Sequence, residues 1–135
     1  MNHQFKIALL WILIVFCYLL HGYYHVAELF FGVDIKIPDA KGEVPLSSHL
    51  FSLLIEIVPL SAGLAALYVT RKWFTWASLV FAILLGLLNV VHLVMTFMHE
   101  SSDIRQLALL AFIIAVNILL VKELNISRKS SIIPN

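Results

Sequence analysis

Long apolar stretches alternate with short polar ones along the 135-residue chain. A helix needs about 20 apolar residues to cross the hydrocarbon core of a bilayer, and four stretches reach or approach that length. They cover residues 5–31, 50–69, 73–98 and 104–124. The longest polar segment, 32–48, contains prolines and a glycine that favour turns over a continued helix. The pattern predicts an all-α protein with a single domain, an integral membrane four-helix bundle with antiparallel neighbours.

Composition agrees with a membrane protein. Hydrophobic residues make up 61% of the chain and charged residues 13%, whereas soluble domains average about half and a quarter. The lipid bilayer is therefore the expected surroundings. The formal net charge of +1 offers no basic surface for nucleic acid, which excludes that class of partner. With Cys17 as the one cysteine, neither an internal disulfide nor a paired-cysteine redox motif can form.

Basic residues indicate the orientation of the four helices. Six of the nine Lys and Arg residues lie at the start of the first stretch, between the second and third, and at or after the end of the fourth: Lys6, Arg71, Lys72, Lys122, Arg128 and Lys129. By the positive-inside rule these regions are cytoplasmic, so both termini are expected inside. Segment 32–48 is then the large extracytoplasmic loop.

Two local features refine the predicted helices. Pro59 predicts a kink in the second helix, because proline has no N–H to donate to the preceding turn. Residues from Asn125 onward are mostly polar, which predicts a mobile tail after the fourth helix.

Seven ionisable residues interrupt the first three apolar stretches. A titratable side chain in hydrocarbon is costly, so each is a candidate for a functional site. They are His21, His25, Glu28, His49, Glu56, His92 and His99. Spacings of three, four and seven place the members from each stretch on one face of their helix. Three polar faces predict a shared site inside the bundle.

The depth of these residues divides them into two layers. With a rise of about 1.5 Å per residue, His21, Glu56 and His92 lie roughly 9–15 Å below the outer ends of their helices, and Asn89 lies at the same level. His25 lies between the layers. The expected mouth on the non-cytoplasmic side is formed by Glu28, His49, His99 and Glu100.

Imidazole and carboxylate groups on facing helices are the donors that hold metal ions in helical bundles. The expected ligands are His21, His25 and His92, with Glu56 as a fourth ligand or as a catalytic general base. The second shell or mouth then comprises Glu28, His49, Asn89, His99 and Glu100. Zinc, iron or copper suits such donors. A centre of this kind would activate water or oxygen for chemistry on a lipid or another apolar substrate.

Two other classes of function remain open on the sequence. The first is a small proton-coupled transporter or channel-like protein in which Glu56 and His21 titrate, with a homodimer enclosing the path. The second is an accessory subunit whose polar faces meet a partner membrane subunit. In that subunit, His21 and His92 would supply two axial ligands to haem. The residues alone do not decide whether the protein is an enzyme.

Two short motifs resemble a known family. His25-Val26-Ala27-Glu28 ends the first stretch, and Asn89-Val90-Val91-His92-Leu93 lies in the third. Together they resemble the small bacterial membrane proteins named for an HXXEE motif, although Leu29 stands where the second acidic residue would be. That family has no assigned activity. The resemblance implies that His25, Glu28 and His92 belong together, in a protein of the bacterial inner membrane.

Overall fold

The computed structural model describes residues 2–36, 42–99 and 103–130. These residues are almost entirely helical and include no strand, which confirms the predicted fold class. The helices are α1 (His3–Ala27), α2 (Leu46–Ser52), α3 (Val58–Tyr68), α4 (Lys72–His99) and α5 (Ile104–Ser130). A 3₁₀ turn, Glu28–Phe31, extends α1, and a π-helical turn, Leu53–Ile57, joins α2 to α3.

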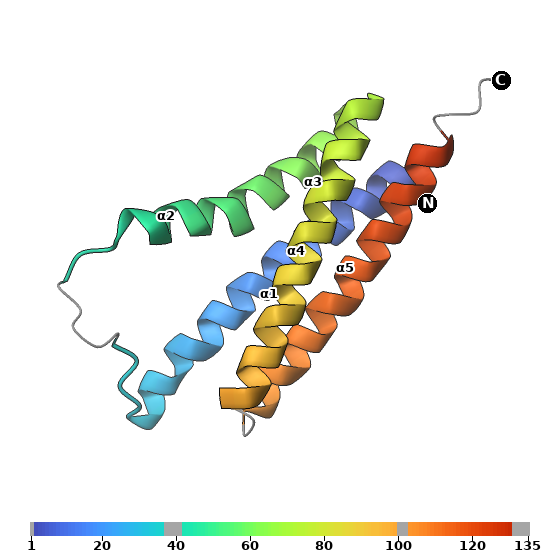
Figure 1. The fold of residues 1–135 in the computed structure, drawn as a ribbon. Helices are drawn as coiled ribbons and strands as arrows, with labels where there is room; N and C mark the ends of the chain where they lie inside the picture. Colours follow the sequence, from blue (N-terminus) through green and yellow to red (C-terminus); the bar gives the residue numbers. More distant parts are fainter. Residues whose placement is uncertain (1, 37–41, 100–102, 131–135) are drawn as a thin grey trace.

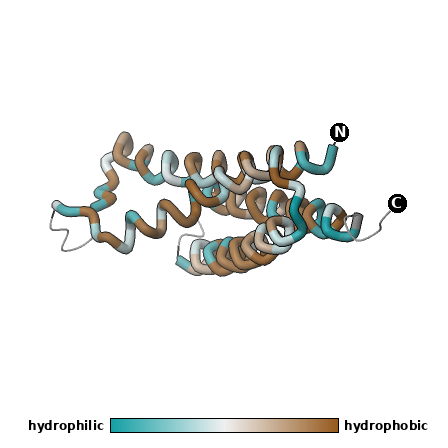
Figure 2. Tube along the Cα trace, turned by 90° about the horizontal axis from the view of Figure 1, so that it is seen from above, coloured by the Kyte–Doolittle hydropathy of each residue, from teal (hydrophilic) through white to brown (hydrophobic). Residues whose placement is uncertain are grey.

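Four segments are long and apolar enough to cross a membrane, with α2 and α3 together forming the second. Figure 2 shows hydrophobic residues along the middle of the molecule and hydrophilic ones gathered mainly toward the ends of the helices. The first turn of α1 and the last turn of α5 lie at the same end of the molecule (Figure 1). This arrangement fits the even number of crossings expected from the sequence.

The second span is interrupted where Pro59 was expected to disturb it. Proline cannot donate to the carbonyl of Ile55, four residues earlier. The helix responds with the π-helical turn Leu53–Ile57 immediately before Pro59. Beyond this turn α2 leans away from the other helices (Figure 1), and all seven of its residues are exposed. The interruption therefore separates a packed half of the span, α3, from an unpacked half, α2.

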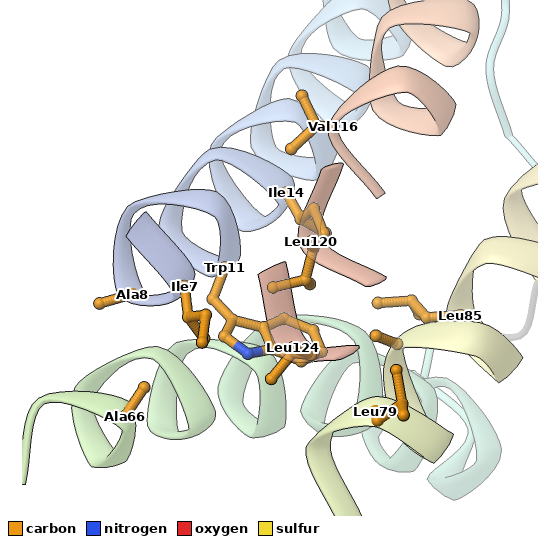
Figure 3. Close-up of a cluster of buried hydrophobic side chains, with 11 residues drawn as sticks. Ile7, Ala8, Trp11, Ile14, Ala66, Leu79, Leu85, Val116, Leu120 and Leu124 are labelled. Atoms are coloured by element: carbon orange, nitrogen blue, oxygen red, sulfur yellow. The ribbon is translucent and has the colours of Figure 1, made fainter. Parts of the chain in front are cut away.

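The main core lies toward the end of the molecule that holds the termini. There α1 packs against α3 and α5, and α5 packs against α4. Trp11 is fully buried, and Figure 3 shows it among side chains from the other helices. A Cβ on Gly63 would lie 3.0 Å from the Cβ of Trp11, so the glycine permits α3 to approach α1 closely. The buried members are Ile7, Ala8, Trp11, Ile14, Ala66, Leu79, Ala82, Leu85, Val116, Leu120 and Leu124.

Three helix ends differ from the predicted ones by two residues or more. The second span begins at Leu46 rather than at residue 50. The fourth helix continues to Ser130 rather than ending at residue 124, so the segment 125–130 is helical and not a tail. The guanidinium of Arg128 stabilises this extension: it lies 4.4 Å from the centre of the Trp76 ring and donates to Asn125 Oδ1 at 2.7 Å. The first helix begins at His3, because the Asn2 side chain accepts from the backbone N–H of Gln4. The rest of the expected tail, 131–135, lies outside the described residues.

Candidate functional site

Two histidines predicted for the deep layer meet across the α1–α4 interface. The Nε2 atoms of His21 and His92 lie 3.1 Å apart, although the residues are 71 positions apart in the chain. Their rings meet edge to face, with centroids 4.9 Å apart. His21 is half-buried and His92 is on the exposed side of α4. The pair therefore joins two helices through the two nitrogen atoms that can bind a proton or a metal ion.

His25 lies one helical turn further along α1. Its ring stands perpendicular to that of His21 at a centroid distance of 4.8 Å. Its Nδ1 is 4.0 Å from Glu28 Oε1, at the edge of ion-pair range. Histidines 21, 25 and 92 thus form one continuous cluster that extends to Glu28. Within the described part of the chain, however, no group of three His, Cys, Asp or Glu side chains is arranged to hold a metal ion.

The remaining predicted site residues lie apart from the pair. Glu56 is half-buried in the π-helical turn. The side chains of the second span that line the pair's cavity are Phe51 of α2 and Ile55 of the turn. His49 is exposed on α2, and His99 is exposed at the end of α4. Glu100 lies outside the described residues. The full set of four metal ligands therefore stays a prediction, and the structure brings its His21 and His92 members together.

A cavity of about 150 Å³ adjoins the histidine pair. Its lining is mainly apolar, with the polar groups coming from α1 and α4. The residues are Tyr18, His21, Phe51, Ile55, Leu88, Asn89, His92 and Leu110. They come from α1, α2, the π-helical turn, α4 and α5, so the cavity lies where the second span separates from the bundle (Figure 1).

Tyr18 and Asn89 form the inner wall of this cavity. The Tyr18 hydroxyl donates to Asn89 Oδ1 at 2.8 Å. Asn89 is only 2% exposed, and its Nδ2 has no hydrogen-bond partner among the residues that the structure describes. A buried donor left unpaired costs about 1–3 kcal/mol. The sequence predicted Asn89 at this depth but did not single out Tyr18.

Gln106 is a further member of the site that the sequence analysis missed. It is completely buried at the start of α5, and its amide faces the His21 ring. Neither amide atom of Gln106 nor Nδ1 of His21 completes a hydrogen bond within the described ranges. Gln106 belongs to the buried stripe of α5, in the same stripe as Leu110, Ile113 and Asn117. Its spacing of four, seven and eleven residues from Leu110, Ile113 and Asn117 places it on the same helix face, and this spacing could have identified it from the sequence.

Below Tyr18 and Asn89 the bundle is closed by apolar packing. Cys17, Leu110 and Ile113 form a small buried cluster at this level. Trp11 and Ile14 follow, both with no exposed surface. The polar groups of the site thus occupy the half of the molecule away from the termini.

Searches of protein-family models, curated proteins and solved structures found no match for the chain.

Proposed function

We propose that this chain is a multi-pass protein of the bacterial inner membrane that binds a divalent transition-metal ion between His21 and His92, toward the non-cytoplasmic face. The observation that carries the proposal is the 3.1 Å separation of the two Nε2 atoms. It combines with the location of the pair in segments apolar enough to span a membrane. Polar side chains at such positions are costly unless they serve a site.

The distance between the nitrogens suits two ligands of one ion. A zinc–imidazole bond measures about 2.0–2.1 Å. Two such bonds to nitrogens 3.1 Å apart would enclose an angle of about 95–102° at the metal. That angle lies between the octahedral value of about 90° and the tetrahedral value of about 109°.

Gln106 can stabilise the tautomer of His21 that carries its proton on Nδ1 and leaves Nε2 free to bind a metal ion. Binding through Nε2 leaves the proton on Nδ1, and metal-binding histidines usually donate this second N–H to a neighbouring oxygen. The Gln106 amide faces His21 and has a carbonyl oxygen without a partner in the described structure. A small rotation of this amide would accept the Nδ1 proton and fix the ring.

Two protein ligands would leave several coordination positions open toward the cavity. Water in such a position becomes a stronger acid, and a carbonyl oxygen in the same position becomes polarised. The apolar cavity wall favours a hydrophobic reactant. We therefore propose metal-dependent chemistry on an apolar molecule, with Glu56 retained as a second-layer acid or base.

The two other hypotheses have less support. A proton path along His21 and the neighbouring polar groups would have to pass the fully buried Trp11 and Ile14. Haem would need far more space, since the cavity of about 150 Å³ is below the range of roughly 300–1,000 Å³ for ordinary ligand pockets. An accessory role with a partner subunit would leave the histidine pair without an explanation.

Elemental analysis of the purified protein, together with its optical spectrum, tests this proposal. After reconstitution with zinc, iron(II) or copper(II) and removal of loose ions, the expected content is about one ion per chain for the metal that binds. His92→Ala should lower this content at least tenfold, whereas His99→Ala, an exposed histidine of the same helix, should leave it unchanged. Equal content in the two variants, or none in the wild-type protein, would overturn the proposal.

A further inference from the structure

The cavity beside the histidine pair contains one polar group that metal binding does not use. Asn89 presents Oδ1 to the Tyr18 hydroxyl at 2.8 Å, so this oxygen is occupied. Its Nδ2 is buried and unpaired among the described residues, and Asn89 lines the cavity. A ligand oxygen that accepts this N–H would remove the penalty of an unpaired donor.

The other walls define what surrounds that oxygen. Phe51, Ile55, Leu88 and Leu110 make the cavity largely apolar, and none of the described residues that line it is Lys or Arg. In the metal-free protein, a carboxylate or phosphate would be buried there without a Lys or Arg partner, which is strongly unfavourable. A neutral acceptor, such as a carbonyl oxygen, meets the same donor at a much lower cost of desolvation.

The size and position of the cavity indicate where the ligand comes from. At about 150 Å³ it can hold only the end of a larger molecule. Phe51 and Leu88 are half and two-fifths exposed, so the cavity reaches the lipid-facing surface. α2 supplies Phe51 to this wall, and all seven residues of α2 are exposed. A hydrocarbon chain attached to the bound end would extend directly into the bilayer.

We propose that this cavity binds the carbonyl end of a neutral, chain-bearing lipid, with the carbonyl oxygen accepting from Asn89 Nδ2. This inference names the substrate class of the site. The place of the carbonyl beside a metal rests on the proposed function, whereas the hydrogen bond to Asn89 does not require the metal.

The test uses 2-undecanone labelled with ¹³C at its carbonyl, titrated into the full chain in detergent micelles. The carbonyl stretching band should shift to lower frequency on saturable binding, as expected for a hydrogen-bonded ketone. Asn89→Leu should weaken binding by about 2–12-fold, the equivalent of one lost hydrogen bond. Asn117→Leu is the matched control. Asn117 is equally buried with an unpaired Nδ2 among the described residues, but it does not line this cavity.

A second variant keeps the test decisive if Asn89→Leu fails to fold. Ile55→Trp fills the cavity from the second span and should abolish the shifted band while leaving Asn89 in place. Titrations of the metal-free and metal-loaded protein separate the two proposals. Ketone binding without any metal binding would sustain the inference and contradict the proposed function. Metal binding with no shifted band, or with a band unaffected by Ile55→Trp, would overturn the inference.

Discussion

Tyr18 on α1 donates its hydroxyl hydrogen to Asn89 on α4 across 2.8 Å. Together with the His21–His92 pair one turn further along, this bond links two helices whose main packing partners are α3 and α5. Nearer the other end of the two helices Trp11 stacks on Phe81, whereas at this level the α1–α4 contact includes polar groups, and the cavity forms beside them.

Tyr18→Phe should lower the free energy of unfolding by about 0.6–1.7 kcal/mol. This is the range for hydrogen bonds between membrane helices, and the upper part is expected because Asn89 Oδ1 loses its donor. Tyr23→Phe is the control, since Tyr23 lies on the same helix and is 60% exposed. Unfolding by SDS in mixed micelles measures the free energy of unfolding of both variants. Equal stability of the two variants would show that the bond does not stabilise the contact.

Gly86 allows Asn117 to pack against the backbone of α4. A Cβ at position 86 would collide with the Asn117 side-chain oxygen. Gly86→Ala should therefore destabilise the protein by about 1–3 kcal/mol, the usual cost of overpacking. Gly22→Ala is the control, because a Cβ there meets nothing within 4 Å and alanine favours the helix.

The same substitution can be repeated in an Asn117→Ala background. If the collision is the cause, the cost of Gly86→Ala should largely disappear there, as a double-mutant cycle of thermal midpoints would record. If Gly86→Ala destabilises the protein equally in both backgrounds, the collision with Asn117 is not the cause.

Glu123 ties the beginning of α1 to the end of α5. Its carboxylate is 2.7 Å from His3 Nδ1 and 3.5 Å from Lys6 Nζ. Glu123→Gln should cost less than about 1 kcal/mol in overall stability, because both partners are partly exposed. Hydrogen exchange should nevertheless accelerate in the first two turns of α1. Glu43→Gln, in the exposed loop, should leave that exchange unchanged. Protection that is the same in the two variants would contradict this role.

Cys17 makes the orientation of the chain easy to test. It is 1% exposed and should not react with a maleimide in the folded protein. Val44→Cys, in the loop before α2, should be labelled in intact cells by a membrane-impermeant maleimide. Thr70→Cys, between α3 and α4, should be labelled only after the membrane is opened. The reverse pattern would invert the proposed orientation and place the histidine pair toward the cytoplasm.

The sequence predicted the four spans well because their signal is local. Length and apolar content decide which segments can cross a bilayer. The break near Pro59 also follows from one residue's missing N–H. The helix ends were harder. The extension of α5 to Ser130 depends on the contact of Arg128 with Trp76, which lies on another helix.

Part of the site, the His21–His92 pair, could also be predicted from a local signal, the position of each histidine along its helix. Matching depth on two parallel helices, the first and third spans, was enough to pair His21 with His92. Glu56 illustrates what spacing cannot decide. Seven residues separate it from His49, which places both on one face of an ideal helix but not toward the bundle. In the structure Phe51 and Ile55 line the cavity, whereas Glu56, the next residue of the π-helical turn, is not among the lining residues.

The central claim is that His21 and His92 bind one metal ion together. Copper(II) is the best probe, because it binds nitrogen donors most strongly among the divalent ions of this series. Pulsed electron paramagnetic resonance of the protein with one equivalent of copper(II) counts the coordinated imidazoles. We predict two in the wild-type protein and in His99→Ala, and one in His21→Ala and in His92→Ala. The same imidazole count in all four proteins, or copper that remains unbound, would contradict the account.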